Sequence, residues 1–87
     1  MNIYILQGSC GEYSDRIDWI VRAYKYKEQA DADRTKADYE VGAVIKKLNG
    51  EYWRNLTPSE KEMLTVDPKA QLDYTLTTYW VTEVELL

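Results

Sequence analysis

The sequence lacks the residue types on which several classes of protein chemistry depend. Among its 87 residues there is no histidine, no phenylalanine and only one cysteine. Without histidine, the chain has neither imidazole acid–base catalysis nor histidine metal ligation, and it has no histidine pH switch. The lone cysteine, Cys10, closes no internal disulfide and cannot build a zinc site from several thiolates.

Long hydrophobic runs and an excess of positive charge are also missing. No segment approaches the ~18 apolar residues of a membrane span, and residues 1–7 lack the basic start of a secretory signal. Eleven basic residues against fifteen acidic ones give a net charge of −4, which argues against a nucleic-acid-binding surface. We therefore expect a cytoplasmic protein that binds neither nucleic acid nor membrane, with Cys10 as a reduced thiol.

The composition supports one small α+β domain over residues 1–87. Hydrophobic residues make up 45% of the chain and charged residues 30%, the balance of an ordinary globular protein. So short a chain holds a single core. Eight tyrosines and three tryptophans supply all the aromatic rings. Because these rings carry a polar atom, they suit the edge of a core or an interface better than a dry interior.

Alternating apolar side chains predict three strands. Residues 2–8 and 17–26 are typical of the two arms of a hairpin around the loop 8–16, which is rich in glycine and serine. Residues 17–26 also fit a helical period, but their β-branched and aromatic content favours a strand. A last strand over 75–87 is rich in Thr, Tyr, Trp and Val.

Two helices are predicted between the second and third strands. Over 27–48 the apolar residues recur at helical spacing and share one face: Ala30, Ala37, Val41, Val44, Ile45 and Leu48. The following Asn49-Gly50 is a typical helix stop. Thr57-Pro58-Ser59-Glu60 has the pattern of a capping box, which starts a short helix that runs to about residue 64.

This order of elements predicts a three-stranded antiparallel sheet with strand order 2-1-3 and the long helix across one face. Sorting the strand residues by side gives a helix-facing set: Ile3, Ile5, Trp19, Val21, Ala23, Trp80, Val84 and Leu86. The opposite set is also apolar, and we expect it to form an interface: Tyr4, Leu6, Ile20, Tyr24, Tyr79 and Val81. A solvated sheet face would carry polar residues, so something should cover this second face.

Three alternatives exist for what covers the second face. The chain itself could fold back over it with the apolar residues that follow the long helix: Tyr52, Trp53, Leu56, Met63 and Leu64. A second copy could cover it in a homodimer, or a different protein could dock there. Each large apolar side chain removed from water contributes roughly 1.5–3 kcal/mol, so an apolar face of this extent matters greatly for stability.

Reactive chemistry has one candidate, the loop between Cys10 and Arg16. The spacing of these two residues matches the cysteine phosphatase loop, in which a thiolate attacks phosphorus and an arginine holds the phosphate oxygens. Glu12 and Asp15 inside the loop would repel a phosphate dianion. A strand is expected to follow, where a helix N-terminus would lower the pKa of the thiol. A small phosphate-binding or phosphatase-like enzyme is therefore the alternative function.

The acidic residues near this loop give no metal-binding pattern. Glu12, Asp15, Asp18 and Asp73 could gather oxygen ligands, but their spacing lacks the alternating acids and the central glycine of an EF-hand loop. We expect no metal and no cofactor. A salt bridge from Arg16 to Asp15, Asp18 or Asp73 is expected instead.

Two stretches stand out beside the Ile3-Tyr4-Ile5 opening. One is Gly11-Glu12-Tyr13-Ser14-Asp15-Arg16 followed by Trp19, and the other is Asp73-Tyr74-Thr75 running into Glu83-Val84-Glu85-Leu86. With these stretches the chain resembles a family of small proteins encoded in bacteriophages and prophages. The resemblance covers both ends of the chain and leaves the region from about residue 49 to 68 unmatched.

This resemblance implies a protein of the host-cell cytosol that acts by contact with another protein. Small acidic phage proteins without catalytic residues often bind a host or phage protein, and inhibitors of host defence are among them. The resemblance also suggests that the loop motif of Glu12, Tyr13, Asp15 and Arg16 meets Asp73 and Tyr74 at one end of the sheet, as a binding site or as a clasp of the fold. The expected function is a non-enzymatic accessory protein that forms a homodimer.

Overall fold

The computed structural model describes residues 1–11, 13–51, 55–70, 72 and 77–87. Strands β1 (Asn2–Cys10), β2 (Ile17–Tyr24) and β3 (Thr78–Glu85) form an antiparallel sheet in the order β2-β1-β3. A 3-10 turn, η1 (Tyr13–Asp15), lies in the loop between β1 and β2. The predicted α+β fold class and the predicted strand order are both confirmed.

The two predicted helices are also present. Helix α1 (Lys27–Leu48) buries one stripe of its surface, and it ends at Asn49 in the left-handed conformation, with φ of 48°. Helix α2 (Pro58–Glu62) begins with the predicted capping box. The backbone N–H of Glu60 donates to the Thr57 hydroxyl at 3.3 Å, and the N–H of Thr57 donates to the Glu60 carboxylate at 2.9 Å.

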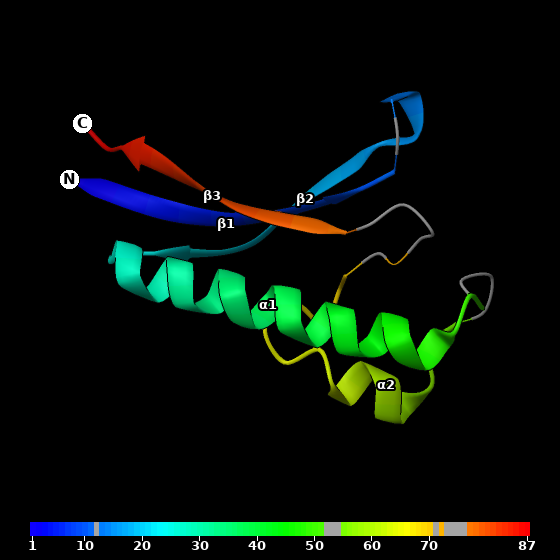
Figure 1. Cartoon of the computed structure of the whole chain (residues 1–87). Helices are drawn as coiled ribbons and strands as arrows, with labels where there is room; N and C mark the ends of the chain where they lie inside the picture. The colour runs from blue at the N-terminus through cyan, green and yellow to red at the C-terminus, as the bar shows by residue number, and fades with distance from the viewer. Residues whose placement is uncertain (12, 52–54, 71, 73–76) are drawn as a thin grey trace.

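The elements are arranged with α1 between the sheet and α2 (Figure 1). The core lies between the sheet and α1, where Leu6, Val44 and Leu48 are among the most deeply buried side chains. Leu64 and Val66, which follow α2, complete the same core. No described helix covers the other face of the sheet (Figure 1). Among the described residues, no helix has the length and apolar character that a bilayer crossing requires.

The two predicted sheet faces are exchanged over most of the sheet. Leu6, Tyr24 and Tyr79, which we expected on an interface, are buried in the core beneath α1. Tyr4 and Val81 pack against the same core. This part of the prediction is wrong, because alternation along a strand separates its two sides without indicating which side a helix covers.

Hydrogen-bond partners explain why α1 covers the face that carries the tyrosines. The Tyr79 hydroxyl donates to Asp67 Oδ2 at 2.7 Å, and the Tyr24 hydroxyl donates to Asp33 Oδ2 on α1. Burial and then the bond to Asp33 raise the pKa of Tyr24 to about 12. The carboxylates on the helix side therefore satisfy donors that would otherwise be buried without partners.

A β-bulge accounts for the remaining differences. The register of β1 against β2 places Leu6 opposite Arg22 and Gln7 opposite Ile20, so Val21 is an extra residue in β2. The β2 residues that precede the bulge lie on the sides of the sheet predicted for them. The β2 residues that follow it lie on the opposite sides. Ile20 is consequently the one member of the predicted interface set on the uncovered side of the sheet, where it is 68% exposed.

Candidate functional site

The candidate site is the sheet face that α1 leaves open, which we call the uncovered face. Strand register brings its apolar members together, because Val84 lies opposite Ile3 and Ala23 lies opposite Ile5. Every one of them keeps some exposure to solvent. The uncovered face consists of Ile3, Ile5, Ile20, Ala23, Trp80 and Val84.

The described residues of the segment that follows α1 do not cover this face. Leu56, Met63 and Leu64 pack on the core beneath α1, on the other side of the sheet. Tyr52 and Trp53, the two aromatic residues in the predicted cover, lie outside the described residues.

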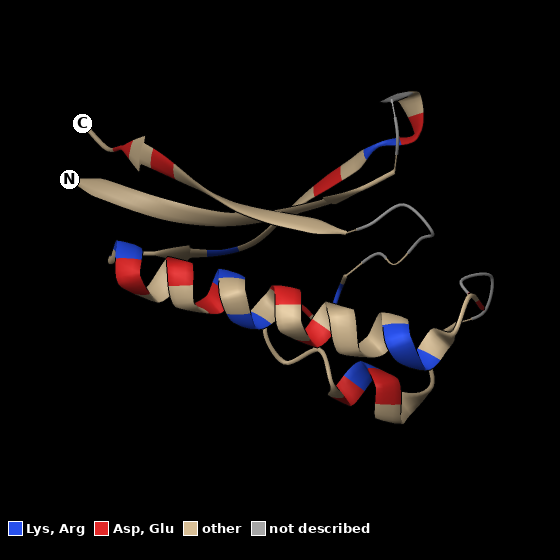
Figure 2. Ribbon diagram, viewed as in Figure 1, with Lys and Arg blue, Asp and Glu red and all other residues tan. Residues whose placement is uncertain are grey.

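The uncovered face carries almost no charge, although the whole chain carries −4. Strand β1 has no charged residue and is uniformly tan in Figure 2. In β3, Glu83 accepts a hydrogen bond from the Tyr4 hydroxyl at 3.3 Å and so belongs to the side of α1. Away from the Arg16–Asp18 ion pair at its end, polar residues on the uncovered side include the neutral pair Thr82 and Gln7, joined by a 2.7 Å bond from the Thr82 hydroxyl to Gln7. A partner can therefore meet this face without desolvating many charges.

An ion pair and an aromatic ring mark one end of the uncovered face. Arg16 Nε donates to Asp18 Oδ1 at 2.9 Å, which realises one of the three predicted salt bridges. The Arg16 guanidinium also lies 5.8 Å from the centroid of the Trp80 ring, within the range of a cation–π interaction. Arginine and tryptophan are the side chains most often found at the energetic centre of protein interfaces.

The rest of the predicted loop motif is only partly described. Asp15 is exposed in η1. Glu12, Asp73 and Tyr74 lie outside the described residues, as does the side chain of Tyr13. The predicted meeting of Arg16 with Asp73 is therefore still a prediction.

Cys10 and Arg16 lie on either side of a turn that needs a glycine. Gly11 has φ of 94°, and a Cβ on it would lie 2.4 Å from the backbone oxygen of Asp15. Cys10 itself is 6% exposed at the end of β1. After Arg16 the chain passes directly into β2, where the loop of a cysteine phosphatase would pass into a helix.

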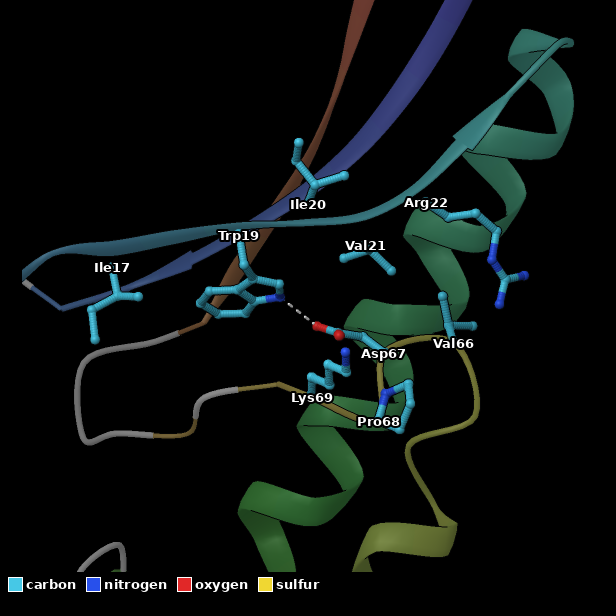
Figure 3. Close-up of a pocket in the computed structure, with 9 residues that line it drawn as sticks. All are labelled: Ile17, Trp19, Ile20, Val21, Arg22, Val66, Asp67, Pro68 and Lys69. Carbon is cyan, nitrogen blue, oxygen red and sulfur yellow. Dashed lines mark hydrogen bonds between the residues drawn. The ribbon is translucent and has the colours of Figure 1, made fainter.

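A second feature, which sequence reasoning missed, is a groove beside β2. It has a volume of about 440 Å³ and lies between β2 and the segment 66–69 (Figure 3). Asp67 is 5% exposed at this groove, and its Oδ2 accepts hydrogen bonds from Trp19 Nε1 at 2.8 Å and from the Tyr79 hydroxyl at 2.7 Å. The two rings meet edge to face, with centroids 6.5 Å apart. Burial and then the bond to Asp67 raise the pKa of Tyr79.

The sequence pattern alone did not single out Asp67. The available signal was the absence of phenylalanine, because every buried tyrosine or tryptophan brings a donor that needs an acceptor. Among the described residues, no group of three or more metal-ligating side chains is placed to hold a metal ion. Comparisons with protein-family models, with curated proteins and with solved structures found no match for this chain.

Proposed function

We propose that this chain is a non-enzymatic phage or prophage accessory protein that acts by protein–protein contact and associates with a second copy through the uncovered face. The observation that carries the proposal is an apolar sheet face without a described cover, in a chain whose charges lie elsewhere. Exposed apolar patches of this kind mark sites of association in proteins of this size.

The second copy is the occupant that the charge distribution favours. Two copies each carry a net charge of −4, so they repel one another in most orientations. Contact through the uncovered face keeps the carboxylates of α1 and of the helix side of β3 away from the interface. The Arg16–Asp18 pair at its end is already neutral in sum. A strongly basic or acidic partner would gain little from such a surface.

The area of the face indicates which class of interface the dimer would form. Three strands spaced about 4.8 Å apart and eight residues long at about 3.3 Å per residue give a flat footprint of roughly 380 Å². With side-chain relief, two copies would bury about 1,000 Å² together, below the ~1,200–2,000 Å² of stable specific interfaces and within the range of weak, transient ones. We therefore expect a weak dimer, with a dissociation constant in the micromolar range.

The phage context rests on the resemblance of the two end motifs and on the acidity of the chain. Small acidic phage proteins without catalytic residues often inhibit a host protein by stoichiometric binding. The proposed activity of this chain is inhibition of a host defence protein. The test concerns the association itself, because that step can be measured on the purified protein.

Sedimentation analysis over a range of concentrations tests the proposal. The parent protein should change from monomer to dimer as concentration rises through the micromolar range. Ile5→Lys, at the centre of the uncovered face, should remain monomeric. The matched control is Tyr39→Lys, which adds the same charge at an apolar residue that is 78% exposed on α1. This control should dimerise like the parent.

Circular dichroism and thermal unfolding should show that both variants fold. A parent protein that stays monomeric at every concentration would overturn the proposal. Dimerisation of folded Ile5→Lys with the affinity of the parent would overturn the assignment to this face.

A further inference from the structure

The groove beside β2 runs along the outer edge of that strand. Ile20 lies on the uncovered side of the sheet and Val21 packs against the core on the helix side, yet both line the groove. A groove that touches both faces of one strand must also include its edge. Figure 3 shows β2 along one side of the groove and the segment 66–69 along the other.

This edge has backbone groups that the sheet does not use. Within the described part of the chain, strand β2 pairs only with β1, so the N–H and C=O groups of alternate residues in β2 point away from the sheet. The opposite edge of the sheet differs, because Arg34 from α1 donates to the carbonyl oxygen of Tyr79 in β3 at 3.0 Å. In addition, Glu83 and Glu85 place two negative charges on β3.

The lining of the groove indicates what it would accept. Ile17, Trp19 and Val66 supply apolar surface for a large side chain. The volume of about 440 Å³ lies within the range of about 300–1,000 Å³ that is usual for ligand sites. Asp67 already receives two hydrogen bonds from protein donors, so it holds the Trp19 ring in place as a wall of the groove.

The other charged residues that the structure describes at the groove are cations, in a chain that is acidic overall. Arg22 and Lys69 line it, and the Arg22 side chain is 57% exposed at a distance of 3.8 Å from Asp33. Asp67 is the one carboxylate among the described lining residues, and it is buried. The exposed charged side chains among these described residues are those of Arg22 and Lys69, which are complementary to acidic side chains.

We propose that this groove binds an extended acidic peptide by strand addition to β2, with a large apolar side chain seated between Trp19 and Val66. The peptide backbone completes the hydrogen bonds of the β2 edge, the apolar side chain fills the groove, and flanking carboxylates approach Arg22 and Lys69. This site borders the uncovered face and shares Ile20 with it, but peptide binding at the β2 edge does not depend on the homodimer.

Fluorescence polarisation with a labelled peptide that alternates glutamate and leucine provides the test. This peptide should bind the parent protein, whereas peptides that alternate lysine with leucine, or glutamate with serine, should bind at least about tenfold more weakly. Methylation of alternate backbone nitrogens in the glutamate–leucine peptide should abolish binding, because the ladder needs those donors. Equal binding of all the peptides, or no binding of any, overturns the proposal.

Variants locate the bound peptide. Lys69→Glu should weaken binding at least about tenfold, whereas the matched reversal Lys47→Glu, on an exposed position of α1, should leave it unchanged. Amide resonances of β2 should shift on binding and those of β3 should not. Shifts confined to β3 would overturn the assignment to β2.

The dimer-defective Ile5→Lys should still bind the peptide, which keeps this test independent of the proposed homodimer. If folded Ile5→Lys fails to bind the peptide, the peptide site requires the dimer, and the proposal of a peptide site at the β2 edge of each copy is wrong.

Discussion

Replacement of Gly8 by alanine tests the central packing contact of this fold. Gly8 lies in the middle strand, opposite Trp19 of β2 and Tyr79 of β3. A Cβ at Gly8 would lie 2.8 Å from two atoms of the Trp19 ring and 2.9 Å from Tyr79 Cε1. Carbon atoms in contact prefer separations of about 3.5–4.0 Å, so the rings would have to move by several tenths of an ångström or more.

Neither ring can move freely, because both donate to the same oxygen of Asp67. Overpacking of this kind costs about 1–3 kcal/mol. If a ring instead moves away and breaks its hydrogen bond to the Asp67 carboxylate, the loss of that bond costs a similar amount, about 1.5–3 kcal/mol. Alanine recovers about 0.5–1 kcal/mol of the entropy that glycine loses in a strand. We therefore expect Gly8→Ala to lower the free energy of unfolding by about 2 kcal/mol.

Urea unfolding followed by circular dichroism and tryptophan fluorescence measures this loss. For a domain of this size, a loss of about 2 kcal/mol corresponds to a fall in Tm of roughly 8–16 °C. Gly42→Ala is the matched control, because a Cβ at Gly42 meets no atom within 4 Å. In the interior of α1 the same substitution should stabilise the protein by about 0.5–1 kcal/mol.

A double-mutant cycle then identifies the clash. Combining Gly8→Ala with Trp19→Ala should make the cost of the first substitution smaller than in the parent, since one of the two rings is gone. An unchanged or raised unfolding midpoint for Gly8→Ala would refute the reasoning. The same holds if the two substitutions are simply additive.

Three further predictions concern the ionisable and capping groups. Burial alone would raise the pKa of Glu40, but hydrogen bonds from Thr65 and the following backbone N–H, with a nearby lysine, bring it below its ordinary value. Glu40 should therefore stabilise the fold above pH of about 4.3 and lose this effect as pH falls through its lowered pKa, and Glu40→Gln should flatten that part of a pH–stability curve. Thr57→Ala removes the acceptor for the Glu60 N–H and should cost about 1 kcal/mol in urea unfolding, whereas Thr57→Ser should cost little. In the folded protein the pKa of Tyr24 is raised to about 12. The protonated Tyr24 side chain therefore contributes to the stability of the fold below pH of about 10, and this stabilisation is lost as pH rises through the raised pKa. Tyr24→Phe should flatten the alkaline end of the same pH–stability curve.

Local signals predicted the helices of this fold accurately. The apolar spacing over 27–48 and the Asn49-Gly50 stop correspond to α1 and to its left-handed cap. The pattern from Thr57 to Glu60 corresponds to the capping box of α2. In each of these cases the determining interactions lie within a few residues of chain, so the sequence displays all of them together.

The faces of the sheet could not be predicted in the same way, because they depend on contacts between distant segments. Alternation gave two consistent sets of side chains, but the choice between them rests on acceptors outside the strands, such as Asp33 on α1 for Tyr24 and Asp67, 48 residues from Trp19, for the Trp19 ring. The bulge at Val21 also depends on pairing with β1 and leaves no mark in the composition of β2. The candidate site therefore lies on the opposite side of the sheet from the predicted one. The reason for expecting a site is unchanged: one apolar face of the sheet has no described helix over it.

The shared acceptor at Asp67 ties three positions of the chain together. Phenylalanine at 79, or a ring without a donor at 19, would leave the carboxylate with one fewer partner in a buried setting. An apolar residue at 67 would leave both the Trp19 and the Tyr79 donors without their acceptor. Substitutions at these positions are therefore tolerated in combination and resisted singly, so in any diverging lineage of this fold the rings and the acid should change together.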